Sequence, residues 1–223
     1  MNATAAQPAD HDQPTTSARG YLALGDSYTI GEGVAAAETW PWLLAEALAE
    51  RIGEAAPVVV ARTGWTAAEL LSALADDNGR RAGAATPYGL VSLLIGVNDQ
   101  YRDHHLDTHL AGFNRLLDLG IDFAGGDHRR LLVVSIPDWS VSAFAGNDAR
   151  GRPAIAAAID RYNAAQMQLC RERGIAHVDI TGISRRCGAD PAMFASDGLH
   201  PSGRQYAAWL APILAAATAL PGD

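Results

Sequence analysis

The sequence has no apolar run that approaches the about 20 residues needed to span a bilayer. It has no internal repeat and no low-complexity segment beyond alanine-rich stretches. The N-terminus lacks the basic start and the apolar stretch of a secretory signal. Together these absences predict a cytoplasmic protein with no integral membrane segment, unless a leader has been removed.

Cysteine and positive charge are also scarce. Cys170 and Cys187 are the two cysteines, too few for a disulfide scaffold, and they fit free thiols in a reducing compartment, although a bond between them stays open. Seventeen Lys and Arg face 25 Asp and Glu, for a formal net charge of −8. That balance argues against nucleic acid and anionic membrane as partners.

The chain does have enough apolar material for one core. With 48% hydrophobic residues in a chain of 223, we expect a single domain over 20–220. Residues 1–19 are polar and include Pro8 and Pro14, which predicts a flexible N-terminal tail.

Strand-like and helix-like segments alternate along the domain. Short apolar runs predict strands at 21–24, 58–61, 90–95, 131–136 and 175–180. Apolar residues at helical spacing predict helices at 40–52, 67–76, 153–173 and 203–220, and one with Leu106, Leu110, Phe113, Leu117 and Ile121 on one face. This alternation is typical of an α/β fold, a parallel sheet of about five strands with helices on both faces.

Two polar motifs lie near opposite ends of the chain. Gly25-Asp26-Ser27 follows the first expected strand, and Asp197-Gly-Leu-His200 precedes the last expected helix. A serine hydroxyl is a poor nucleophile until a base takes its proton, and the base needs an acceptor to orient it. On a turn, Asp197 can accept the Nδ1–H of His200 and leave Nε2 facing Ser27. The two motifs therefore predict a serine hydrolase.

Two further blocks follow strands and supply hydrogen-bond donors. Gly64 comes after the strand at 58–61, and Asn98 comes after the strand at 90–95. When Ser27 attacks a carbonyl, the oxygen gains negative charge and needs donors aimed at it. The backbone N–H groups of Ser27 and Gly64 and the side-chain NH2 of Asn98 are the candidates. Because the carboxyl ends of parallel strands meet at one edge, we expect these groups to lie together.

The order Ser27, Gly64, Asn98, His200, each in this local setting, resembles the SGNH hydrolases, also called GDSL-type esterases and lipases. The resemblance extends from about Tyr21 to the last helix. Tyr28 departs from it, because the family's name implies leucine there, and the departure bears on packing or pocket shape. The resemblance implies a three-layer α/β/α, flavodoxin-like fold. It also implies a cofactor-free reaction with Ser27, Asp197 and His200 as the catalytic residues.

Residues beside these blocks are candidates for the substrate pocket. Trp65 follows Gly64, Tyr101 and Arg102 follow Asn98, and Trp139 follows the strand at 131–136. Tyr28, next to the expected nucleophile, is a further candidate. Core packing or surface contact is nearly as compatible with each position.

Three other chemistries are disfavoured. His105 and His109 are four apart on a helix beside His104, but no Glu lies between them as a general base, so no metal is expected. Gly31-Glu-Gly33 lacks the third glycine of a dinucleotide fingerprint. An α/β-hydrolase would need G-x-S-x-G, and Thr29 occupies the final glycine position.

Two acidic neighbours of the catalytic positions have a structural interpretation. Asp26 and Asp99 are expected to tie loops together through backbone N–H groups rather than act as additional acids.

We therefore expect a serine esterase that hydrolyses small-molecule carboxylic esters, with short acyl groups favoured by the absence of a long lid insertion. A carbohydrate deacetylase or acyltransferase, and a lysophospholipase or thioesterase, are alternatives that the resemblance leaves open. A non-catalytic α/β binding module is a further one. The natural ester and the oligomeric state stay open.

Overall fold

The computed structural model describes residues 20–53, 56–76, 79, 82–83 and 87–220. The expected N-terminal tail, 1–19, lies outside the described residues. A single five-stranded sheet has the order β2-β1-β3-β4-β5, and every neighbouring pair is parallel. Its strands are β1 (Tyr21–Gly25), β2 (Val58–Ala61), β3 (Leu90–Leu94), β4 (Leu131–Val134) and β5 (Ala176–Val178). The predicted α/β class with a flavodoxin-like sheet is confirmed.

The central strands form because their side chains are apolar on both faces. Every residue of β1, β3 and β4 is buried, whereas the edge strands β2 and β5 are partly exposed. Strands covered on both sides carry continuous apolar runs rather than alternating ones. Successive residues of β1 accordingly join different cores: Tyr21 and Ala23 pack in one cluster, and Leu22 and Leu24 in the other.

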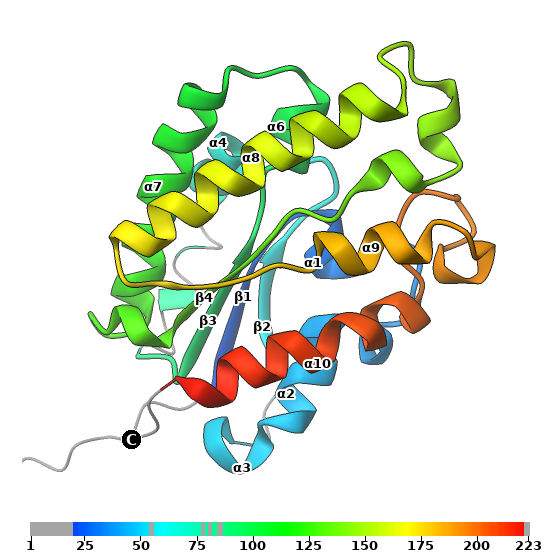
Figure 1. Cartoon of the computed structure of the whole chain (residues 1–223). Helices are drawn as coiled ribbons and strands as arrows, with labels where there is room; N and C mark the ends of the chain where they lie inside the picture. The colour runs from blue at the N-terminus through cyan, green and yellow to red at the C-terminus, as the bar shows by residue number, and fades with distance from the viewer. Residues whose placement is uncertain (1–19, 54–55, 77–78, 80–81, 84–86, 221–223) are drawn as a thin grey trace, which may run out of the picture.

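Helices cover both faces of the sheet (Figure 1). On one face α4 and α7 pack together, with α8 beside α7, and on the other α2 packs against α10. The helices on the first face are α4 (Ala67–Leu74), α7 (Leu106–Phe123) and α8 (Arg152–Glu172); those on the second are α2 (Trp40–Ala47), α3 (Ala49–Ile52) and α10 (Gly203–Ala219). Shorter elements are α1 (Ser27–Ile30), α6 (Val97–Tyr101), α9 (Thr181–Cys187) and the 3-10 turns η1 (Ala36–Glu38), η2 (His128–Arg130), η3 (Trp139–Val141), η4 (Phe144–Asn147) and η5 (Pro191–Met193).

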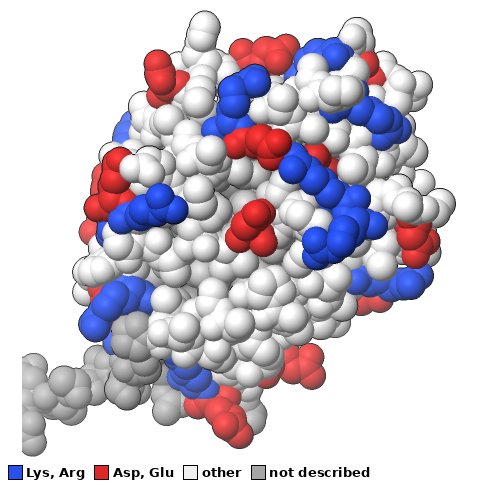
Figure 2. Space-filling view, viewed as in Figure 1, with Lys and Arg blue, Asp and Glu red and all other residues white. Residues whose placement is uncertain are grey.

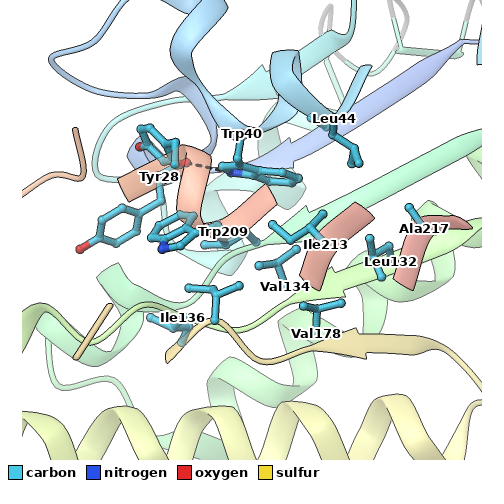
Figure 3. Packing of buried hydrophobic residues seen from close by; sticks show 14 of the residues in the cluster. Tyr28, Trp40, Leu44, Leu132, Val134, Ile136, Val178, Trp209, Ile213 and Ala217 are labelled. Carbon is cyan, nitrogen blue, oxygen red and sulfur yellow. Dashed lines mark hydrogen bonds between the residues drawn. The ribbon is translucent and has the colours of Figure 1, made fainter. Parts of the chain in front are cut away.

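The core under α10 fixes the start of α1, which carries Ser27. Trp209, Ile213 and Ala217 form one stripe of α10 at four-residue spacing and pack toward the sheet (Figure 3). Burying each of the larger side chains contributes about 1.5–3 kcal/mol. Trp40, fully buried at the start of α2, donates its indole N–H to the carbonyl of Tyr28 at 3.0 Å. The helical core therefore anchors the residue next to Ser27.

The structure differs from the sequence predictions in several connections. The helix expected at 40–52 is interrupted at Leu48, and the strands expected at 131–136 and 175–180 are shorter. The loop expected after the fifth strand contains α9, whose first N–H, that of Thr181, is accepted by the carboxylate of Asp179 at 2.8 Å. Long-range contacts decide these places: Ser135, for example, accepts the N–H of Ile180 at 2.9 Å.

The surface shown in Figure 2 mixes both signs of charge, and a group of basic side chains lies over α9. Arg185 of α9 is paired with Asp138 and Asp160, so part of this positive charge is balanced locally. Among the described helices, none has the length and apolar character that a membrane crossing requires.

Candidate active site

A cavity of about 180 Å³ lies where the strands end. It is lined by Ser27, Tyr28, Thr63, Gly64, Val97, Asn98, Tyr101, Trp139, Phe144, Leu199 and His200. Five segments far apart in sequence meet here because the five strands are parallel and end at the same edge, and one segment follows each strand. The chain order reverses between β1 and β3, the kind of switch point where such sheets bind ligands.

Ser27 is the first residue of α1 and is 4% exposed. Asp26 caps this short helix by accepting the N–H of Tyr28 at 3.0 Å. The turn from β1 into α1 is so tight that a Cβ on Gly25 would lie 2.4 Å from the carbonyl oxygen of Leu94. Glycine at 25 is therefore a steric requirement for presenting Ser27 to the cavity.

Asp26 is fully buried, and its second oxygen, Oδ2, has no hydrogen-bond partner among the described residues. Burial, with a smaller contribution from the nearby Asp99, raises the pKa of this carboxyl to about 8. Asp26 therefore caps α1 largely as a neutral acid at pH 7. The N–H contact agrees with the structural role expected from the sequence.

Asp197 and His200 form a local pair. Asp197 accepts the backbone N–H groups of Leu199 at 2.9 Å and His200 at 3.0 Å, and its Oδ2 lies 2.6 Å from Nδ1 of His200. Partial burial works to raise the pKa of Asp197, but these hydrogen bonds outweigh it and hold the pKa below its usual value. The carboxylate is thus ionised and fixes the imidazole, which shares the cavity with Ser27.

The side chains of Ser27 and His200 do not hydrogen-bond to each other in the part of the chain that the structure describes. Such contacts are often long in the absence of substrate and tighten when it binds. The ring of Tyr28 packs against the imidazole at a centroid distance of 5.6 Å, so His200 is supported on that side by an aromatic ring.

Gly64 follows β2 in a left-handed conformation, with φ of 85°. A residue with a Cβ rarely adopts this conformation. Two residues later Thr66 caps α4 with a capping box: Glu69 accepts the N–H of Thr66 at 2.8 Å, and the hydroxyl of Thr66 accepts that of Glu69. Gly64 therefore lies just before a helix N-terminus, as the sequence predicts.

Asn98 lies in the short helix α6, which the sequence does not signal. Its amide donates to the carbonyl of Trp65 at 3.0 Å. An amide carries two N–H groups, so this contact leaves one of them uncommitted, and Asn98 lines the cavity. The next residue, Asp99, accepts the N–H of Ala67 at 2.9 Å, in line with its expected structural role.

Asp99 is further enclosed by two histidines. Nδ1 of the buried His109 lies 3.4 Å from its Oδ1, and Nδ1 of His104 lies 3.5 Å away. Burial works to raise the pKa of Asp99, but His109 and the N–H of Ala67 outweigh it and lower the pKa. In the described residues no group of three or more His, Cys, Asp or Glu is placed to hold a metal ion.

An aromatic wall closes one side of the cavity and consists of Tyr101, Trp139 and Phe144. Their ring centroids lie 5.6–6.2 Å apart. Arg150 lies over the rings of Tyr101 and Trp139 at 5.4 and 5.5 Å and is held by Asp148 through two hydrogen bonds. Sequence reasoning missed Phe144 and Arg150, because neither belongs to a motif or follows a strand directly.

Five residues were candidates for the pocket, and the structure divides them. Tyr28, Tyr101 and Trp139 line the cavity. Trp65 does not line it and packs against the core under α4 and α7. Arg102 does not line it either, because its guanidinium turns to Glu69 and the carbonyl of Gly64.

Both cysteines are buried free thiols. Burial raises the pKa of Cys170 to about 12 and also raises that of Cys187, which keeps both protonated and unreactive at neutral pH.

A parallel three-layer fold with a serine, a histidine and an oriented aspartate at its carboxyl edge defines a class of α/β/α hydrolases. A sequence model of the GDSL-like lipase/acylhydrolase family matches residues 23–208, and the chain belongs to this family. It is therefore a hydrolase that acts on ester bonds.

Solved structures are similar over nearly the whole chain. TesA has a TM-score of 0.68 and 18% identity, over 91% of this chain and 100% of TesA. The acetylxylan esterase Axe2 of Geobacillus stearothermophilus has a TM-score of 0.64 and 20% identity, over 90% of this chain and 94% of Axe2. Phospholipase A1 of Streptomyces albidoflavus NA297 has a TM-score of 0.62 and 22% identity, over 92% and 100% of the two chains. At these identities the likeness establishes the fold. No curated protein matches the sequence.

Proposed function

We propose that this hydrolase is a cofactor-free serine esterase for small carboxylic esters with short acyl groups. Ser27 Oγ attacks the ester carbonyl while His200 takes its proton, and Asp197 holds the imidazole in the required orientation. The proton then passes from His200 to the departing alcohol, which leaves an acyl group on Ser27. In the second half His200 removes a proton from the water that attacks the acyl group, and it returns this proton to Ser27 Oγ as the acid leaves.

The oxyanion would be held in both halves by the N–H groups of Ser27 and Gly64 and the free amide N–H of Asn98. The observation that carries the proposal is the meeting of Ser27, Gly64, Asn98 and His200 in one cavity, with Nδ1 of His200 2.6 Å from the Asp197 carboxylate. These are the groups that acyl transfer requires: a nucleophile, an oriented base and aimed donors.

The size of the cavity supports a short acyl group. Its 180 Å³ lie below the roughly 300–1,000 Å³ of pockets that enclose drug-sized ligands. Its walls are mainly apolar, as suits a hydrocarbon chain, and they include the buried rings of Tyr28 and Trp139.

The test is hydrolysis of p-nitrophenyl esters from acetate to decanoate by the wild type and Ser27→Ala. We expect turnover that is greatest for the shortest chains and is lost in the variant. A fluorophosphonate should label the wild type on Ser27 and leave the variant unlabelled. Equal turnover by both proteins would contradict the serine mechanism, and no turnover with no label would favour a binding module.

A carbohydrate deacetylase is a second candidate, favoured by the rim of the cavity. Tyr101 and Phe144 are 44% and 41% exposed beside it, and aromatic faces commonly carry sugar rings. The fold is also similar to that of Axe2, named as an acetylxylan esterase. Acetylated xylo-oligosaccharides hydrolysed with a higher kcat/KM than p-nitrophenyl acetate would support this candidate.

A further inference from the structure

The space where Gly64 would carry a side chain is nearly open. Among the described residues outside its chain neighbours, a Cβ built on Gly64 would meet one heavy atom within 4 Å, Nη2 of Arg102 at 3.6 Å. Glycine has the greatest backbone freedom of all residues, and here it is in a left-handed conformation in open surroundings. An N–H group aimed at an oxyanion must nevertheless be fixed before the reaction, so contacts from neighbouring segments have to supply the rigidity.

Arg102 supplies the most direct contact. Its Nη2 donates to the carbonyl of Gly64 at 2.6 Å, and its Nη1 lies 3.2 Å from both carboxylate oxygens of Glu69. Glu69 in turn accepts the N–H of Thr66 in the capping box of α4. The guanidinium therefore joins Gly64 to the first turn of the helix that follows it.

Arg102 also belongs to the helix that carries Asn98. It is the C-cap of α6, and its N–H bonds to the carbonyl of Asn98 at 3.0 Å. The side chain of Asn98 contacts Trp65, and Asp99 contacts Ala67. Three contacts from one short segment thus hold residues 64–67 in register with Asn98.

The other side of Gly64 is tied toward Ser27. The hydroxyl of Thr63 donates to the carboxylate of Glu32, whose own N–H bonds to the carbonyl of Ser27 at 3.1 Å. The Thr63–Gly64 peptide, which carries the N–H of Gly64, therefore lies between two contacts: one from the Thr63 side chain to Glu32, and one from the Gly64 carbonyl to Arg102.

We propose that Arg102 is a positioning residue that sets the direction of the Gly64 N–H toward the reacting carbonyl oxygen, with Glu69 as its support. The inference rests on the proposed function, in which Gly64 is an oxyanion donor. Arg102 does not line the cavity, so it acts through Gly64 and makes no substrate contact. The planar fork of arginine suits this task, because one nitrogen can serve the carbonyl while another serves the carboxylate.

The experiment compares Arg102→Ala, Arg102→Lys and Glu69→Gln in the full chain, with Arg129→Ala as the matched control. Arg129 is an exposed arginine that makes a similar ion pair with Asp127, at the opposite edge of the sheet. We expect Arg102→Ala to lower kcat about 10-fold, less than the about 100-fold or more that follows removal of a whole oxyanion donor. KM should stay within about twofold, because ground-state binding is unaffected.

Arg102→Lys should lie between the wild type and Arg102→Ala, since lysine can reach one of the two partners at a time. Glu69→Gln should lower kcat by less than Arg102→Ala, because glutamine still accepts the N–H of Thr66 but no longer pairs with the guanidinium. Inhibition by an alkyl boronic acid, which forms a tetrahedral adduct, should weaken in proportion to kcat/KM. The Lys variant keeps the test decisive if Arg102→Ala does not fold.

Two outcomes overturn the inference. A raised KM with unchanged kcat would make Arg102 a substrate-binding residue, and unchanged values of both would remove it from the reaction. Ser27→Ala separates these results from a failure of the proposed function. If Ser27→Ala is inactive while the Arg102 variants match the wild type, the serine mechanism stands and the positioning role falls.

Discussion

The Asp197–His200 turn and the junction of α4 with α6 hold their polar groups by different means. The turn is local: one carboxylate accepts two N–H groups and the imidazole within four consecutive residues. The junction is built across more than thirty residues of sequence, through contacts from Asn98, Asp99 and Arg102 to residues 64–67. A short motif can therefore specify the proposed base, whereas the proposed oxyanion donors depend on the folded sheet.

The largest expected effect comes from separating the structure of the turn from its charge. Asp197→Asn keeps an oxygen that can accept the N–H groups of Leu199 and His200, but it presents an NH2 or a neutral oxygen to Nδ1. The proton of the imidazole is then no longer held on Nδ1. We expect kcat to fall about 10⁴-fold, with the melting temperature nearly unchanged. Steady-state kinetics and calorimetry of the same preparation measure both. A loss below about tenfold would show that Asp197 does not orient the base.

The junction is broken by Asn98→Ala. One amide N–H holds the carbonyl of Trp65 and the other is the expected oxyanion donor, so the variant loses both. We expect kcat to fall about 10²–10³-fold and KM to change little. The control is His105→Ala, an exposed residue that precedes α7. An equal loss in KM with kcat intact would assign Asn98 to substrate binding instead.

These two regions also mark how far the sequence is informative. The strands after which Ser27, Gly64 and Asn98 fall are predictable, because continuous apolar runs bounded by loops signal buried parallel strands. The capping box of Thr66 is also predictable, because its sequence signal is local and spans four residues. Helix α6 and the contacts of Arg102 are not predictable from the sequence, because they form only once β2 and β3 lie on either side of β1.

The aromatic wall lies further beyond the reach of sequence reasoning. Trp139 follows a strand and is therefore a candidate. Phe144 begins the second of two short 3-10 turns after that strand, and no sequence signal places it at the cavity. Trp65 illustrates the opposite error. It follows Gly64, which lines the cavity, yet its own side chain packs against the core under α4 and α7.

A third aspartate sharpens the comparison, since Asp26 and Asp197 both accept backbone N–H groups but differ in burial. Asp26 has a pKa of about 8 when folded, against 3.8 for the free side chain. Between these values the folded protein keeps a proton that the unfolded chain has lost. The contribution of Asp26 to the free energy of unfolding therefore falls as the pH rises from about 4 to about 8, and is steady above that.

Asp26→Asn removes this titration while preserving the cap, because its Oδ1 can still accept the N–H of Tyr28. Relative to the wild type, we expect the variant to gain at least about 1 kcal/mol of stability between pH 4 and pH 8. Urea unfolding at both pH values measures the difference. The exposed Asp122→Asn on α7 is the control, and a pH dependence identical in wild type and Asp26→Asn would mean that Asp26 is ionised when folded.

The smallest expected effect tests whether the two regions act together. The N–H of Phe144 bonds to the carbonyl of Gly198 in the Asp197–His200 turn at 3.3 Å, and its ring contacts Tyr101 at the end of α6. Phe144 thus links the local turn, through its backbone, to the long-range junction, through its ring, at the rim of the cavity. Phe144→Ala removes the ring and leaves the backbone contact in place.

We expect Phe144→Ala to raise KM about three- to tenfold for aryl esters and to leave kcat within about twofold, because the ring contributes binding that is equal in ground and transition states. Met167→Ala, which removes an exposed apolar side chain from α8, is the matched control. If kcat falls instead and KM does not move, the ring positions His200 rather than substrate. The turn would then depend on the aromatic wall and lose its independence from the rest of the site.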